Sequence, residues 1–92
     1  MSVDEAMREI KAIERLIGPY EHFSYEAKKV LAALRDLKNV LESMDEKSIK
    51  RIMREMSNID ELAAPYRGYD FVEETLVHAK KLLDELRKIV GE

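Results

Sequence analysis

The sequence of 92 residues contains no cysteine, no tryptophan and no glutamine, and it has only three glycines and two prolines. Without cysteine, the chain has no disulfide, no thiolate nucleophile and no cysteine-based zinc site. It also lacks a GxSxG nucleophile motif and any glycine-rich phosphate loop. No apolar run approaches the ~20 residues of a membrane-spanning helix, and residues 1–5 are acidic where a signal peptide is basic. We therefore expect a soluble, cytoplasmic protein.

The overall composition is that of a globular protein. Hydrophobic residues make up 46% of the chain and charged residues 38%, a balance that disordered chains do not have. The net charge of −3 argues against wholesale electrostatic capture of DNA or acidic membranes. Abundant Glu, Lys and Arg beside only two asparagines is typical of proteins from thermophiles, which is the source we expect. The length predicts a single domain over residues 1–92.

The apolar pattern between Pro19 and Met44 predicts the central helix of the fold. Eight residues recur alternately three and four positions apart, which places them in one stripe along a helix. They are Tyr20, Phe23, Ala27, Val30, Leu34, Leu37, Leu41 and Met44. Further apolar residues widen the stripe on both flanks, as in a helix that contacts two neighbours. This helix begins either at Pro19 or after a cap at Ser24.

Two helices flank the central one. The stripe Val3, Ala6, Ile10, Ile13 and Ile17 predicts a first helix that ends before Gly18 and Pro19. After Met44 the apolar residues change phase to Ile49, Ile52, Met56, Ile59 and Ala63. A break between residues 43 and 47 explains this change better than one continuous helix to residue 64, and either Ser43 with Glu46 or Asp45 alone caps the new helix. This third helix ends before Pro65, with a kink at Ser57 and Asn58.

A fourth helix completes the predicted fold. Asp70 with Glu73 forms a capping box at its start. Its stripe consists of Val72, Leu76, Ala79, Leu83, Leu86 and Val90. Because all connections are short, consecutive helices are antiparallel, and we predict an all-α fold, a four-helix antiparallel up-down-up-down bundle.

The polar residues do not predict an active site. No apolar stripe contains Asp, Glu or His, so we expect a hydrocarbon core without the inward carboxylates of di-metal bundles. His78 follows Glu74 by four residues on the face opposite the stripe, which favours a solvated contact over a surface metal site. His22 has no nucleophile or second ligand within sequence reach. We therefore expect a protein that is not an enzyme, without catalytic residues, cofactor or metal.

A basic stripe on the third helix supports an alternative function. Lys47, Lys50, Arg51 and Arg54 share the face opposite the apolar one, as in helices that follow a phosphate backbone. The ordinary interpretation is a solvated face, because Asp45, Glu46, Glu55 and Glu61 lie close by. A nucleic-acid accessory protein is therefore the second choice.

The aromatic residues give the strongest functional hypothesis. All six lie in or beside the first and third connections, which the bundle places at one end: Tyr20, Phe23, Tyr25, Tyr66, Tyr69 and Phe71. They either plug the core, as expected for Phe23 and Phe71, or form a recognition surface. Tyr and Arg predominate in binding hot spots, so the candidate partner-binding residues are Tyr20, Tyr25, Tyr66, Arg67 and Tyr69.

The favoured hypothesis is a non-enzymatic module that mediates protein–protein interaction. Its partner is either another protein or a second copy of the chain, which would make a homodimer. The first helix spans ~22 Å against ~31 Å for the central helix, so Leu41 and Met44 are expected to lack cover and to offer a second apolar patch.

Overall fold

The protein is all-α, as predicted. The computed structural model describes residues 2–91, except for the side chain of residue 2. Its α-helices and two short 3-10 helices (η) follow one another as α1 (Ser2–Ile17), η1 (Gly18–Tyr20), α2 (Tyr25–Ser43), α3 (Glu46–Met56), α4 (Ile59–Ala63), η2 (Ala64–Tyr66) and α5 (Asp70–Val90). Among the described residues, no helix is both long and apolar enough to cross a membrane.

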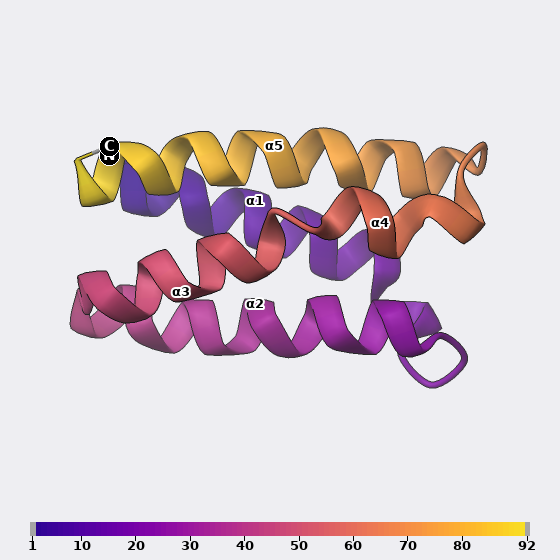
Figure 1. Cartoon of the computed structure of the whole chain (residues 1–92), viewed down its shortest axis with the longest axis horizontal. Coiled ribbons are helices and arrows are strands. Elements are labelled where there is room, and N and C mark those ends of the chain that lie inside the picture. Colours follow the sequence, from indigo (N-terminus) through magenta and orange to yellow (C-terminus); the bar gives the residue numbers. More distant parts are fainter. Residues whose placement is uncertain (1, 92) are drawn as a thin grey trace.

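The helices form the predicted up-down-up-down bundle. Figure 1 shows successive long helices running in opposite directions, with α3 and α4 together forming the third rod. α1 packs against α2 and α5, and α3 packs against the same two helices, which closes a ring of four. The connections around η1 and η2 lie at one end of the bundle, and the turn between α2 and α3 lies at the other (Figure 1). The molecule is 33 Å long and 20 Å across in both other directions.

The break between the second and third helices lies where the phase change predicts it. Met44 adopts the left-handed conformation, with φ of 54°, and ends α2. Asp45 then caps α3, because its carboxylate accepts hydrogen bonds from the Ser48 backbone amide at 3.3 Å and from the Ser48 hydroxyl at 2.8 Å. These hydrogen bonds hold the pKa of Asp45 below its usual range. Of the two caps considered, Asp45 is confirmed.

The kink predicted at Ser57 and Asn58 is also present. α3 ends at Met56 and α4 begins at Ile59. The Ser57 hydroxyl donates to the backbone carbonyl of Arg54 at 2.6 Å, a local bond that bends helices. Asn58 precedes α4 without a hydrogen bond from its side chain to the helix.

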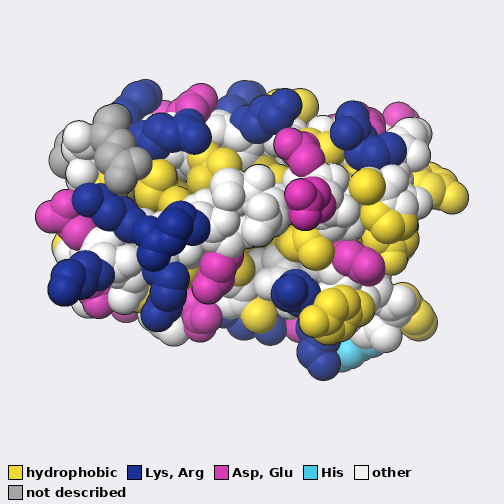
Figure 2. Space-filling model, viewed as in Figure 1, with side chains coloured by type: hydrophobic (Ala, Val, Ile, Leu, Met, Phe, Trp, Pro, Cys, Tyr) yellow, Lys and Arg dark blue, Asp and Glu magenta, His cyan; other side chains and the backbone are white. Residues whose placement is uncertain are grey.

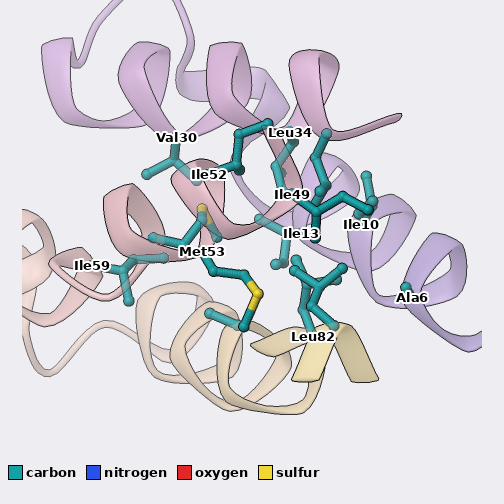
Figure 3. Close-up of a cluster of buried hydrophobic side chains, with 14 of the residues drawn as sticks. Ala6, Ile10, Ile13, Val30, Leu34, Ile49, Ile52, Met53, Ile59 and Leu82 are labelled. Atoms are coloured by element: carbon teal, nitrogen blue, oxygen red, sulfur yellow. The ribbon is translucent and has the colours of Figure 1, made fainter. Parts of the chain in front are cut away.

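The core is a hydrocarbon core, as expected. Figure 3 shows its side chains meeting between the helices. The largest fully buried side chains are Ile10, Ile13, Leu34, Leu37, Ile49, Ile52, Leu82 and Leu86. Thr75 is the one buried polar residue among those described, and its hydroxyl donates to the backbone carbonyl of Phe71 at 2.7 Å. Each buried helix face can therefore pack without unpaired charge.

Two details of the predicted core were wrong. Leu82, which the predicted α5 stripe omits, is fully buried, whereas Leu83 lies at its flank and is half-buried. Leu41 is 3% exposed rather than uncovered, because α3 turns back against α2 directly after it. Met44 is 49% exposed, so only the last residue of the expected patch reaches solvent.

Met44→Gly is expected to stabilise the protein. A side chain in the left-handed region incurs a steric cost that glycine avoids, so we expect a gain of about 0.5–1 kcal/mol. In a domain of this size this raises the midpoint of thermal unfolding by roughly 2–8 °C. Met44→Ala is the control, since it removes the same side chain and keeps the strained backbone. An equal rise in both variants would contradict this explanation.

Candidate functional site

The six aromatic residues lie at one end of the bundle, which we call the aromatic pole (Tyr20, Phe23, Tyr25, Tyr66, Tyr69 and Phe71). They come from η1, the start of α2, η2 and the start of α5. The two connections that carry them meet at the same end in Figure 1, and hydrophobic side chains gather at this end in Figure 2. The antiparallel order of the helices therefore produces the clustering that the sequence predicted.

Phe71 is the ring that joins the pole to the core. It is half-buried and packs against the core cluster. Tyr20 stacks on it, with centroids 4.4 Å apart and planes 11° apart, and Tyr69 meets it in a tilted arrangement at 6.0 Å. Phe71 thus fits its predicted role as a plug, and it brings tyrosines from both connections together.

Phe23 does not plug the core, contrary to the prediction. α2 begins after the cap at Ser24, whose hydroxyl accepts a hydrogen bond from the Ala27 backbone amide at 3.1 Å. Phe23 therefore precedes the helix and lies off its stripe. Its side chain is 87% exposed, the largest exposure among the large hydrophobic residues described.

Three of the four tyrosines are also exposed at the pole. Tyr25 is 70% exposed, Tyr69 61% and Tyr20 40%. The ammonium of Lys29 lies 5.5 Å from the centroid of the Tyr25 ring, within range of a cation–π interaction. Together with Phe23, these are the exposed rings of the aromatic pole.

Tyr66, one of the candidate partner-binding residues, does not present its side chain freely to solvent. It is half-buried, and its hydroxyl donates to Glu26 Oε1 at 2.9 Å and accepts from the Ser24 hydroxyl at 3.2 Å. Hydrogen bonds from the backbone amide of Glu26 itself and from Tyr66 hold the pKa of Glu26 below its usual range. This polar trio joins η2 to the first turn of α2.

Arg67 is exposed but paired. Its Nε and one terminal nitrogen donate to the two carboxylate oxygens of Glu73 at 2.7 and 3.0 Å, and the Gly68 amide donates to Glu73 at 3.1 Å. These contacts lower the pKa of Glu73, with Arg67 the largest cause, and raise the pKa of Arg67.

The capping box predicted for Asp70 and Glu73 is wrong, because α5 begins after Tyr69, and Asp70 lies inside the helix. Glu73 instead orders the turn before it.

A pocket of about 80 Å³, which we call the pole pocket, lies beneath the aromatic surface. Its walls are hydrophobic side chains except for Ser24, Glu26 and Thr75. The hydrophobic lining residues are Ile17, Tyr20, Ala27, Val30, Ile59, Leu62, Ala63, Tyr66, Phe71, Val72 and Leu76. No sequence pattern predicted this pocket, since its walls come from every rod of the bundle.

The two histidines have different surroundings. His78 Nδ1 lies 2.5 Å from Glu9 Oε1, so this partly exposed side chain bridges α5 to α1 and does not pair with Glu74 as predicted. His22 is exposed in the turn before α2. Among residues 2–91, no group of three or more His, Asp or Glu side chains is placed to hold a metal ion.

The basic stripe lies on α3, away from the aromatic pole. Lys47, Arg51 and Arg54 are exposed, and Lys50 is half-buried. Figure 2 shows Lys and Arg side chains grouped over the half of the molecule that contains α3, with acidic side chains among them. The stripe is therefore a separate surface, diluted by acids as the sequence indicates.

Comparisons with known proteins found no relative that bears on these surfaces. No protein-family model matches the chain, and no curated protein or solved structure is significantly similar to it. The function is therefore inferred from the sites themselves.

Tyr66→Phe is expected to lower thermal stability, because it removes the hydroxyl that bonds to Glu26 and keeps the packed ring. The loss of one such hydrogen bond lowers the midpoint by roughly 4 °C. Tyr69→Phe is the matched control, since the Tyr69 hydroxyl has no hydrogen-bond partner among the described residues and its ring is exposed. Equal midpoints for the two variants in scanning calorimetry would show that the trio does not stabilise the pole.

The Arg67–Glu73 pair predicts a pH dependence of stability. Because folding lowers the pKa of Glu73, its stabilising effect is present above the unfolded pKa and is lost as the pH falls through the folded pKa. The difference in thermal midpoint between the native protein and Glu73→Gln should therefore shrink between about pH 7 and about pH 3. Arg67→Gln removes the largest cause of the shift, so in this background the difference should be smaller at neutral pH. A constant difference across this range would contradict the assignment.

Proposed function

We propose that the protein is a non-enzymatic helical-bundle module that binds a protein partner through the aromatic pole. The observation that carries this proposal is the exposure of Phe23, at 87%, at the same end of the bundle as the exposed rings of Tyr25 and Tyr69. An exposed phenylalanine ring has no polar atom to interact with water, and clustered exposed rings are typical of binding surfaces. Burying these rings against a partner would be favourable at low entropic cost.

The candidate residues contribute in different ways. Tyr20, Tyr25 and Tyr69 present rings to the partner, whereas Tyr66 and Arg67 hold the two connections in place through Glu26 and Glu73. Preordered connections lower the entropy that binding must remove. The partner is either another protein or a second copy of the chain.

The other polar side chains support a role without catalysis. Ser24 and Asp45 cap helices, His78 bonds to Glu9, and Arg67 pairs with Glu73. Each of these groups is thus engaged in holding the fold. They do not converge on a common point where a substrate atom could meet a nucleophile and a base.

Phe23→Ser and Tyr25→Ser should abolish partner binding while changing the free energy of unfolding by less than about 0.5 kcal/mol. Val77→Ser is the control, because Val77 is 51% exposed on α5, outside the aromatic pole. Light scattering with increasing concentration measures self-association, and quantitative pull-down from the native organism measures binding of other proteins. Both signals should survive in Val77→Ser and disappear in the pole variants.

Two outcomes would overturn the proposal. One is a partner or dimer that the pole variants retain in full. The other is submicromolar binding of duplex DNA or RNA at physiological salt, lost when Lys50, Arg51 and Arg54 are reversed in charge. That result would support the alternative, in which the stripe of Lys47, Lys50, Arg51 and Arg54 binds a phosphate backbone. The exposure of Lys47, Arg51 and Arg54 on one side of α3 favours this alternative, and their acidic neighbours weigh against it.

A further inference from the structure

We propose that the pole pocket binds a small uncharged hydrocarbon molecule. The surface that its walls present to the open space is almost entirely hydrocarbon, although Ser24, Glu26 and Thr75 contribute to the lining. A site of this kind holds its ligand by removing apolar surface from water and not by hydrogen bonds. Such a ligand needs no protein partner, so this site adds a second binding activity to the one proposed above.

The polar side chains of the lining are already bonded to the protein. The Glu26 carboxylate accepts hydrogen bonds from its own backbone amide and from the Tyr66 hydroxyl, the latter at 2.9 Å. The Ser24 hydroxyl accepts from a backbone amide in the first turn of α2 at 3.1 Å, and the Thr75 hydroxyl donates to the Phe71 carbonyl at 2.7 Å. A charged or strongly polar ligand would therefore lose its hydration in the pocket without finding a partner.

The pocket reaches the deep wall of the core. Six of its lining residues are buried but keep 6–7% exposure, whereas residues at the centre of the core such as Ile13 and Leu37 keep none. These six are Ile17, Val30, Ile59, Val72, Thr75 and Leu76. Water is poorly held against such walls, because an ordered water needs about two to four polar partners. An apolar molecule that displaces poorly ordered water gains affinity.

Two alanines explain why the space exists. Ala27 in the first turn of α2 and Ala63 at the end of α4 both line the pocket. A leucine at either position would occupy part of the volume that now stays open. The kink before α4 sets the position of Ala63, so the pocket depends on the same break that ends α3.

The size of the pocket limits the ligand. Its volume of about 80 Å³ is roughly half that of a ~150 Å³ apolar cavity that takes benzene, which corresponds to about three or four carbon atoms. A compact branched molecule such as 2-methylpropane fills a short, wide space better than a linear chain with the same number of carbons. Xenon is a second apolar probe that enters cavities of this kind.

The test compares three molecules of nearly the same size and shape in titrations of the native protein, followed by amide NMR shifts. 2-Methylpropane, added under pressure, should bind with a dissociation constant on the order of 1–10 mM, within the limit for a ligand this small. Propan-2-ol replaces one methyl group with a hydroxyl and should bind at least about fourfold more weakly, because it buries less apolar surface. Protonated propan-2-amine should not saturate. Xenon and 2-methylpropane should shift the same amides, those of residues that line the pocket.

Three variants assign the binding to this site. Ala63→Leu and Ala27→Leu, which alter two different helices, should each weaken the binding of 2-methylpropane and xenon more than tenfold by filling the space. Ala32→Leu adds the same side chain at an exposed position of α2 outside the pocket and should leave both affinities unchanged. Circular dichroism shows whether each variant is folded.

Each contrary outcome overturns the proposal. Equal binding of 2-methylpropane and propan-2-ol would show that the site does not select apolar surface, and the absence of saturable shifts with 2-methylpropane and xenon would show that there is no site. Unchanged binding in folded Ala63→Leu and Ala27→Leu would place the ligand elsewhere, as would shifts confined to Phe23, Tyr25 and Tyr69. If neither leucine variant folds, the positions of the shifted amides in the native protein decide.

Discussion

The packing of α1 along α5 is the contact on which the rest of the bundle depends. These helices come from the two ends of the described chain and share the most extensive interhelical contact. Ile10, Ile13 and Leu82 are fully buried between the helices (Figure 3), and His78 bonds to Glu9 across the same pair. Closing the ring in this way fixes an alternating order for helices joined by short connections. The first and third connections must then share one end, which creates the aromatic pole.

Helix existence and direction could be predicted from the sequence, whereas details at helix ends could not. The apolar period predicted every long helix, and the phase change predicted the break at Met44 and Asp45, because both depend only on residues close in the chain. The same period failed for Phe23, because Phe23 lies in the turn before the Ser24 cap, where helical spacing does not apply. Leu82 and Leu83 are equally apolar neighbours, and only contacts with other helices decide which one is buried.

The candidate site was predictable in position but not in its contacts. The collection of rings at one end follows from helix order, yet the sequence gives no reason why Tyr66 is half-buried and Tyr69 exposed. That difference arises because Glu26, 40 residues away, accepts the Tyr66 hydroxyl. The pole pocket had no sequence signal at all, because it depends on Ala27 and Ala63 facing each other across the bundle. Contacts of this kind are set by tertiary packing alone.

Tyr20 belongs both to the exposed rings of the pole and to the lining of the pole pocket. This ring is 40% exposed among the surface aromatics, stacks on Phe71, and also lines the pole pocket. The pocket is open to solvent, and a ligand that covered its hydrophobic walls would remove apolar surface from water and fix the position of Tyr20. A partner that covers Tyr20 would also cover one wall of the pocket, so binding at the two places would be thermodynamically linked, and each would change the affinity of the other by the same factor.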